Sequence, residues 1–261
     1  MSIIHPTAII ENGAIIEENV SIGAYSYISS QAKIGSGTKI SSHVVIDGDT
    51  TIGKNNTILS HCVLGSPPQD LKYKGEPVKL IIGDNNTIRE FALINPGTKG
   101  GGSITCIGNN NLLMGYVHLA HDVHIGDYCI LANAANVAGH VIIGNHVVIG
   151  GLTPIHQFVK IGDYVMIAGG SALAQDIPPF CLAEGNRATL RGLNLVGLRR
   201  KLSRDDINEL KSAYRQLFEQ GQPLQEVANN LYQSSNSSKV KELCQFIMES
   251  KRGIPFERKQ Q

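Results

Sequence analysis

Histidines are concentrated in one part of this chain. Six of the nine histidines lie between His118 and His156, and two of them stand in the run His118-Leu-Ala-His121-Asp122. An imidazole, with an ordinary pKa of about 6.5, exchanges a proton readily at neutral pH, and it is also a common metal ligand. A single histidine is most often a solvated surface residue. The functional value of this group therefore depends on whether the fold brings its members together.

The segment that contains these histidines repeats every six residues. A branched aliphatic residue occupies every sixth position from Ile107 to Leu173 without a break, and the same holds from Ile4 to Leu64. This period fits neither a helix face nor an alternating strand. It predicts a solenoid of hexapeptide repeats whose aliphatic residues point into a narrow prismatic core.

Stacking of successive coils follows from this period. Three hexads close one coil, so residues 18 apart in the unbroken block are expected to stack at the strand spacing of about 4.8 Å. Histidines far apart in the chain are thereby gathered into one patch. The predicted columns are His121, Gly139 and Gln157; Asp122, His140 and Phe158; and His118 with Asn136.

Two excursions are expected to leave the coil. We call the six-residue spacing of aliphatic residues the grid. Continued beyond Leu64, the grid would put Asp70 and Glu76 in the core, where unpaired carboxylates are costly, so we expect a loop over about 65–81. Its charged residues are free to reach a ligand. The grid slips by one residue near Gly100-Gly-Gly102, which predicts a second excursion over about 99–106. No helical pattern follows these glycines, which argues against a phosphate-binding loop.

The period changes after Pro178-Pro179. We expect a β-helix domain over residues 1–185 and a helical domain over residues 186–261 that caps one end of the solenoid. Apolar spacing and the N-cap pattern Ser203-Arg-Asp-Asp206 predict the helices of the second domain. They are expected over 190–201, from 203 to about 220, over 223–232 and over 238–250.

Composition narrows the class of protein. A net charge of +1 gives no global field that would attract nucleic acid. Five cysteines without CxxC spacing favour reduced thiols in a cytoplasmic protein. We expect neither a signal peptide nor a transmembrane segment, because no basic N-terminal region or long apolar run is present. Six basic and no acidic residues occur from Arg187 to Arg204, which suits phosphates or an acidic carrier protein.

Short motifs occur in a fixed order along essentially the whole chain: Gln69-Asp-Leu-Lys-Tyr73, Gly100-Gly-Gly102, Asn111-Leu-Leu-Met114, His118-Leu-Ala-His-Asp122, Ala138-Gly-His140, His156-Gln-Phe158, Gly185-Asn186 and Gly197-Leu-Arg-Arg200. In this order they resemble the acyl-carrier-protein-dependent UDP-N-acetylglucosamine O-acyltransferases, which start lipid A synthesis. The resemblance implies a left-handed parallel β-helix of hexapeptide repeats with a C-terminal α-helical domain. It also implies a homotrimer with active sites between subunits, and no cofactor or metal.

The same resemblance implies the chemistry of the site. The sugar 3-hydroxyl attacks the thioester of an (R)-3-hydroxyacyl carrier protein, and His121 is the general base, a role worth about 10²- to 10⁴-fold in rate. Asp122 orients the imidazole, and the Gly139 N–H stabilises the oxyanion. The substrate-binding residues implied by the resemblance are Asp70, Lys72, His118, His140, His156, Gln157, Gly169, Asn194 and Arg200.

Individual positions refine or depart from the family pattern. Gly169 matches a position whose size helps to set acyl length, and a glycine leaves room for a longer chain. Val196 stands where some members have an acidic residue near the nucleotide. Arg187 stands where a histidine is frequent near the acyl end, and Pro96 where an arginine is common.

Alternative functions stay open at this point. A zinc-dependent hexapeptide-repeat enzyme of the carbonic anhydrase type would use His118, His121, His124 and His140 as ligands. The related UDP-3-O-acylglucosamine N-acyltransferases usually carry an N-terminal uridine-binding domain, which we do not expect because the hexads begin at Ile4. A non-catalytic solenoid would tolerate loss of His121. Within the acyltransferase interpretation, the acceptor is either the 3-hydroxy sugar or a 3-amino analogue.

Overall fold

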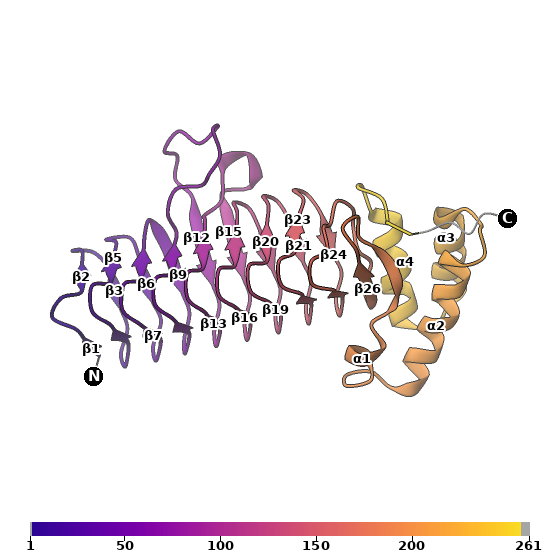
Figure 1. Ribbon diagram of the computed structural model, residues 1–261, viewed down its shortest axis with the longest axis horizontal. Helices are drawn as coiled ribbons and strands as arrows, with labels where there is room; N and C mark the ends of the chain where they lie inside the picture. Colours follow the sequence, from indigo (N-terminus) through magenta and orange to yellow (C-terminus); the bar gives the residue numbers. More distant parts are fainter. Residues whose placement is uncertain (1, 257–261) are drawn as a thin grey trace.

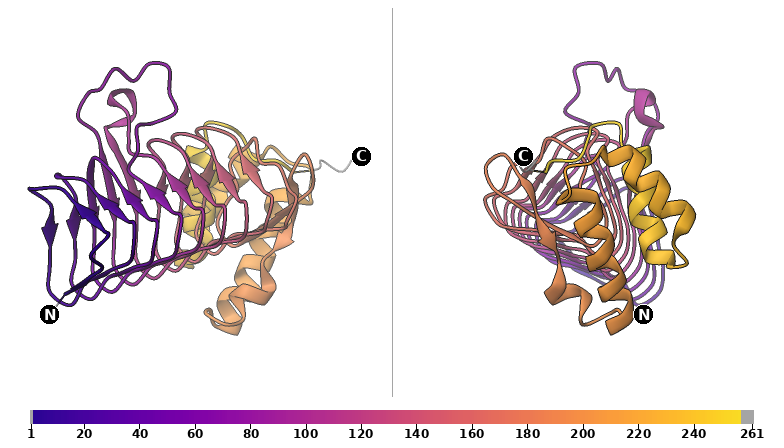
Figure 2. Two further views of the ribbon diagram at one scale, coloured as in Figure 1. Left: turned by 60° about the vertical axis from the view of Figure 1, so that its left-hand side comes forward. Right: turned by 90° about the vertical axis from the view of Figure 1, so that its right-hand side faces the viewer.

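The computed structural model describes residues 2–256, which form an elongated left-handed parallel β-helix with helices at its C-terminal end (Figure 1). Met1 and residues 257–261, the two ends of the predicted domains, lie outside the described part of the chain. Short strands separated by tight corners make three sheets within residues 2–256. An end-on view shows the prismatic cross-section and the helices that cover its C-terminal end, as predicted (Figure 2).

The three sheets are formed by every third strand. Sheet A contains β1 (Ile3–Ile4), β4 (Ser21–Ile22), β7 (Lys39–Ile40), β10 (Thr57–Ile58), β13 (Thr87–Ile88), β16 (Leu112–Leu113), β19 (Ile130–Leu131), β22 (Val148–Ile149), β25 (Met166–Ile167), β26 (Cys181–Glu184) and β27 (Thr189–Leu193). Sheet B contains β2 (Ile9–Ile10), β5 (Tyr27–Ile28), β8 (Val45–Ile46), β11 (Val63–Leu64), β14 (Leu93–Ile94), β17 (His118–Leu119), β20 (Asn136–Val137) and β23 (Pro154–Ile155). Sheet C contains β3 (Ile15–Ile16), β6 (Lys33–Ile34), β9 (Asp49–Ile52), β12 (Lys79–Ile82), β15 (Ile104–Ile107), β18 (His124–Ile125), β21 (Ile142–Ile143) and β24 (Lys160–Ile161).

The strand register confirms the hexad prediction. His118 of β17 pairs with Asn136 of β20, and His124 of β18 pairs with Ile142 of β21, so neighbouring coils are offset by 18 residues. The aliphatic residues of the grid are buried from Ile22 onward, whereas Ile4 stays exposed because no coil lies beneath the first one. Burial of this continuous aliphatic column is the main stabilising contribution to such a solenoid.

Both excursions are present but shorter than predicted. The first ends at β12, which begins at Lys79, and the second ends at β15, which begins at Ile104. Both strands are four residues long because they pair along their whole length with each other, and β12 also pairs with β9. Backbone pairing thus holds residues that the sequence pattern had assigned to loops. The second excursion contains the 3₁₀ turn η1 (Lys99–Gly101).

The helical prediction was correct for three segments and wrong for one. The structure contains α2 (Arg204–Phe218), α3 (Leu224–Ser234) and α4 (Ser238–Glu249), and a Ser203–Asp206 capping box opens α2 as predicted. Residues 190–201 do not form one helix. They form most of β27, antiparallel to β26, and the four-residue helix α1 (Leu195–Leu198). Gly192, at φ 132°, interrupts helical geometry, and the open edge of β26 takes a strand partner instead.

The cysteines are unpaired, in agreement with the sequence analysis. All five thiols are free, and all but Cys106 are buried. None of the helices in residues 2–256 is long and apolar enough to cross a membrane.

Candidate active site

The candidate site is centred on the corner between β17 and β18, where His121 and Asp122 follow one another. His121 Nδ1 lies 2.9 Å from Asp122 Oδ2, and Asp122 adopts a left-handed φ of 58° that turns its side chain back under the ring. If Nδ1 carries the proton and donates it to the carboxylate, Nε2 has a free lone pair. Among residues 2–256 no hydrogen-bond partner of Nε2 occurs, so this nitrogen is available to a ligand.

The Asp122 carboxylate is buried and fully held. Only 2% of the residue is exposed. Thr98 donates twice, from its backbone N–H to Oδ1 at 2.8 Å and from its Oγ1 hydroxyl to Oδ2 at 2.6 Å. The Asp122 backbone N–H donates to Thr105 Oγ1 at 2.9 Å. The two donors of Thr98 replace part of the water that a carboxylate loses on burial.

Gly139 lies directly beside the His121 ring, as the 18-residue spacing predicts. A Cβ added to Gly139 would stand 2.6 Å from Cε1 and 2.8 Å from Nε2 of His121, so only glycine fits without moving the ring. The flanking backbone stays in register, because the His140 N–H donates to the His121 carbonyl at 3.0 Å. In the described part of the chain the Gly139 N–H has no acceptor. A hydrogen-bond donor without a partner thus lies next to the free imidazole nitrogen, although Gly139 itself is buried in the single chain.

His140 and Phe158 extend the site along the next coils. The His140 ring stacks on Phe158 with centroids 4.4 Å apart, and it meets His121 edge-on at 5.0 Å. Its Nδ1 lies 3.7 Å from Asp122 Oδ2. Burial lowers the pKa of His140, and the Asp122 carboxylate offsets part of this effect. His140 is therefore mainly neutral at neutral pH and can serve as a hydrogen-bonding rather than a charged group.

His118 lies on β17, one strand before the corner. Its Nδ1 is 3.1 Å from the Leu93 carbonyl, which fixes the ring with Nδ1 as the donor. Burial lowers the pKa of His118, and the bond to Leu93 opposes this only in part. A neutral ring held in this way offers Nε2 as an acceptor.

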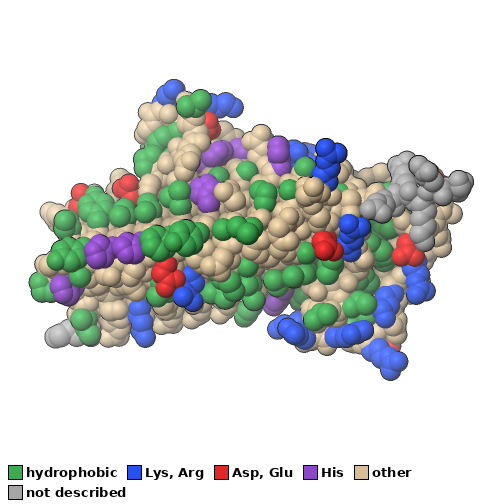
Figure 3. Space-filling model, in the orientation of Figure 1, with side chains coloured by type: hydrophobic (Ala, Val, Ile, Leu, Met, Phe, Trp, Pro, Cys, Tyr) green, Lys and Arg blue, Asp and Glu red, His purple; other side chains and the backbone are tan. Residues whose placement is uncertain are grey.

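The first excursion loop forms a cavity with this corner. Asp70 and Lys72 of the loop, Thr98, and the His140–Phe158 pair line a space of about 460 Å³. The purple histidine side chains gather on the surface beside the projecting loop (Figure 3). The structure thus brings together loop and coil residues that the sequence analysis had assigned to one substrate site.

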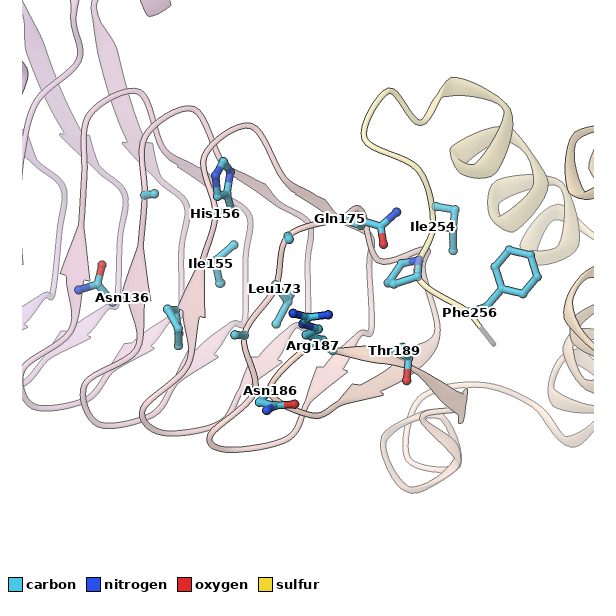
Figure 4. A pocket seen from close by; sticks show the side chains of 16 residues that line it. Asn136, Ile155, His156, Leu173, Gln175, Asn186, Arg187, Thr189, Ile254 and Phe256 are labelled. Atoms are coloured by element: carbon cyan, nitrogen blue, oxygen red, sulfur yellow. The ribbon is translucent and has the colours of Figure 1, made fainter. Parts of the chain in front are cut away.

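A second, larger cavity lies towards the helical end. Its volume is about 920 Å³ (Figure 4). His156 and Asn136 line one side on the sheet B face, and Arg187, Thr189 and the C-terminal segment Ile254–Phe256 line the other. Most of its lining is apolar, which suits an extended hydrocarbon chain.

Other predicted site residues line neither of these two cavities. Gly169 lies at a corner between sheets A and B, packed against Gly150 and Gly151. Asn194 caps α1: its Nδ2 donates to the Tyr164 carbonyl at 2.9 Å, and its Oδ1 accepts from the Gly197 N–H at 3.1 Å. Neither these residues nor the exposed Arg200 and Gln157 line the two cavities. Helix α1 and the excursion loop lie on different edges of the molecule (Figure 1).

The histidines do not form the four-histidine zinc site considered above. Within residues 2–256 the ligand atoms of His121, Asp122 and His140 lie within 4.8 Å of one another, which makes them a possible metal-holding group. His118 and His124 are not part of it. Because Asp122 is already bonded by Thr98 and by the His121 ring, the geometry is that of a hydrogen-bonded histidine–carboxylate pair.

Comparison with known proteins agrees with the geometry. A family model described as UDP N-acetylglucosamine O-acyltransferase, domain 2, matches residues 176–255, and a bacterial transferase hexapeptide model matches residues 107–139. The acyl-(acyl-carrier-protein)–UDP-N-acetylglucosamine O-acyltransferase of Sulfurovum sp. (strain NBC37-1) is 69% identical over 259 residues, which cover 99% of this chain and 100% of the relative. The chain belongs to this acyltransferase family. The enzyme of the same name from Aliarcobacter butzleri is 64% identical over 99% of this chain and 100% of its own length.

Solved structures of the family have the same fold. A UDP-N-acetylglucosamine acyltransferase from Campylobacter jejuni superposes with a TM-score of 0.94 at 52% identity, covering 98% of this chain and 100% of that one. The Arabidopsis UDP-N-acetylglucosamine acyltransferase gives 0.84 at 36% identity over 97% and 100% of the two chains. The family fold thus extends over both the β-helix and the helices.

The sequence analysis missed several residues that contact the site, and it marked others as departures from the family. Thr98, which donates to the buried Asp122 carboxylate, and Thr105, whose hydroxyl oxygen accepts from the Asp122 backbone N–H, were not identified. Of the departures, Arg187 lines the larger cavity, whereas Val196 is exposed on α1. Pro96 lines a cavity with residues of the first excursion loop, and it follows β14, which pairs with β17 just before the His121 corner.

Proposed function

We propose that the protein transfers an (R)-3-hydroxyacyl chain from acyl carrier protein to the 3-hydroxyl of UDP-N-acetylglucosamine, the first step of lipid A biosynthesis. Family membership over the whole chain supports the reaction class. One observation carries the mechanism: a buried carboxylate holds one nitrogen of His121 and leaves the other free beside a glycine N–H.

His121 acts as the general base. Its Nε2 takes the proton of the sugar 3-hydroxyl, and the oxygen attacks the thioester carbonyl carbon. Asp122 keeps the proton of Nδ1 in place and stabilises the imidazolium that forms. When the tetrahedral intermediate collapses, the C–S bond breaks, and the carrier thiolate takes the proton back from His121. Neither the base nor the carboxylate is consumed.

The Gly139 N–H stabilises the oxyanion. This donor has no acceptor in residues 2–256, and it stands against the ring that activates the nucleophile. A backbone donor aimed at the developing charge is worth about 10²- to 10³-fold in related acyl-transfer sites.

Two substrates require two regions of the site. Asp70, Lys72 and His140 line the smaller cavity, whose polar side chains suit the sugar nucleotide. We assign His118, whose Nδ1 is held by the Leu93 carbonyl, to substrate binding through Nε2. The acyl chain lies in the larger apolar cavity, which His156 lines; Gln157, the next residue, is exposed outside it. Gly169, Asn194 and Arg200 complete the binding site, the first for the acyl chain and the other two for uridine and phosphate.

The active unit is a homotrimer with sites between subunits. Asn194 and Arg200 flank α1, which lies on another edge of the molecule than the excursion loop (Figure 1), so we assign them to a neighbouring copy. A row of stacked rings also runs along the A–B corners, and Figure 3 shows it as an exposed stripe. Its members are Tyr25, His43, His61, Phe91 and Tyr116, with centroids 4.8–5.2 Å apart. Light scattering should give about three times the 28.1 kDa chain mass, and a monomer would contradict this arrangement.

The free thiols and the change of fold near residue 186 support a cellular location and a role for each domain. Five free thiols suit the reducing cytoplasm, where we place the enzyme. We assign catalysis to a β-helix domain over residues 1–185 and carrier-protein contacts to a helical domain beginning at residue 186. Support for this boundary is the change there from parallel coils to an antiparallel hairpin and helices.

The experiment that tests the reaction uses purified wild-type protein, UDP-N-acetylglucosamine and a series of 3-hydroxyacyl carrier proteins from short to long chains. Mass spectrometry should detect the sugar nucleotide with one added hydroxyacyl group in ester linkage. Transfer only to the 3-amino analogue would correct the acceptor. No transfer to either sugar would overturn the proposal.

A further inference from the structure

The second excursion encloses the carboxylate of the catalytic pair. Its turn, residues 98–102, packs against the Asp122 side chain, and Thr98 is only 5% exposed. A Cβ on Gly101 would collide with Cγ and both carboxylate oxygens of Asp122. Gly101, the middle residue of the glycine run, therefore has a local physical explanation: its backbone approaches the Asp122 carboxylate too closely for a side chain.

We propose that Thr98 is a positioning residue for the His121–Asp122 pair, and that the 98–102 turn exists to fix the rotamer and the hydrogen-bonding capacity of Asp122. The inference rests on the proposed function, in which His121 is the base. Thr98 borders the smaller cavity with only 5% of its surface exposed, and it acts on the base through the carboxylate.

The two bonds from Thr98 have different tasks. The backbone N–H holds Oδ1, the oxygen that does not face the imidazole, and so sets the plane of the carboxylate. The hydroxyl shares Oδ2 with His121 Nδ1, at 2.6 and 2.9 Å respectively. Two donors on one oxygen divide its negative charge, so the hydroxyl limits how strongly Asp122 favours the protonated ring. His140, 3.7 Å from the same oxygen, is too distant to replace either donor.

The decisive variant is Thr98→Val, which keeps the β-branched shape and the backbone N–H but removes the hydroxyl. Loss of a charge-assisted bond at a buried carboxylate should lower kcat roughly tenfold or more, with little change in KM for the sugar nucleotide. Oδ2 then has His121 as its only side-chain donor, and Asp122 favours the protonated ring more strongly. The low-pH limb of the kcat/KM profile should therefore move to higher pH. Thr98→Ser keeps the hydroxyl and should restore both kcat and the pH profile.

Controls separate this role from a purely structural one. Thr153→Val removes a buried threonine hydroxyl at an A–B corner and should leave kcat and the pH profile at wild-type values. Melting temperatures of the variants show whether the fold is intact. A fall in kcat for Thr98→Val with an unmoved pH limb, or an equal fall for Thr98→Ser, would overturn the inference.

A second measurement makes the test independent of turnover. NMR titration of the His121 imidazole in wild type and Thr98→Val should show the midpoint at higher pH in the variant. If the wild-type protein transfers no acyl group, the proposed function fails, while this titration still reports the coupling. If the wild type is active and the two titration midpoints coincide, Thr98 has no influence on the pair and the inference fails alone.

Discussion

Replacement of Gly139 by alanine tests the site without removing any catalytic group. The new Cβ would lie 2.6 Å from His121 Cε1 and 2.8 Å from Nε2, whereas carbon atoms in contact are normally about 3.5–4.0 Å apart. The ring must therefore move by roughly 1 Å, which stretches the 2.9 Å bond to Asp122 beyond hydrogen-bonding distance. A misplacement of about 1 Å costs on the order of 10²-fold in rate, or about 2.7 kcal/mol in activation free energy.

Steady-state acyl transfer and thermal melts together measure this effect. The backbone of Gly139 does not have a positive φ, so alanine adds no backbone strain and the melting temperature should change little. Gly115→Ala is the matched control, because its Cβ would meet the flexible end of Asn133 at 3.2 Å and the Glu90 carbonyl oxygen at an ordinary contact distance of 3.5 Å. The double variant Gly139→Ala/His121→Ala should be no slower than His121→Ala. Wild-type turnover in Gly139→Ala would refute the assigned geometry.

Three further perturbations follow from individual contacts. Burial lowers the pKa of His118 and His140. Just below about pH 6.5 the unfolded chain therefore binds more protons than the folded one. The free energy of unfolding should fall as the pH drops through this range. Urea titrations of His118→Gln should show a shallower dependence, and an unchanged slope would contradict the assignment. Arg199 lines a basic cavity beside α2, where we expect the acidic carrier protein to dock. Arg199→Glu should raise KM for the carrier protein several-fold and flatten the salt dependence of KM. Lys33→Glu on β6 is the control, and equal effects of the two variants would contradict docking at this surface. Ser203→Ala deletes the cap of α2 and should lower the free energy of unfolding by about 1 kcal/mol with kcat unchanged, while full stability would show that the cap is dispensable.

The β-helix was predictable because each of its coils is specified by residues that are close together in the sequence. One aliphatic residue per hexad specifies a corner, and the 18-residue coil then fixes which residues stack, so the contact of Gly139 with His121 followed from counting alone. The pattern failed after residue 189. There the apolar spacing resembled a helix, but pairing with the exposed edge of β26 outweighed helical propensity and formed β27.

The site was predictable only where the repeat is unbroken. Thr98 lies in the segment where the grid slips, so no column linked it to Asp122, and its contacts depend on the path of the 98–102 turn. The excursion loop was expected to reach the site, and Asp70 and Lys72 do line a cavity with His140. Asn194 and Arg200 could not be placed by counting, because they follow the last coil and belong to a hairpin and helix whose direction the hexads do not set.

The most direct measurement of the central claim compares wild type and His121→Ala in acyl transfer from a 3-hydroxyacyl carrier protein to UDP-N-acetylglucosamine, with the melting temperature of each. Removal of the ring leaves Asp122 bonded by both donors of Thr98, so the fold should persist. We predict a fall in kcat/KM of about 10²- to 10⁴-fold with little change in melting temperature. Wild-type turnover in His121→Ala, or a loss of activity that merely follows unfolding, would contradict the assignment of His121 as the base.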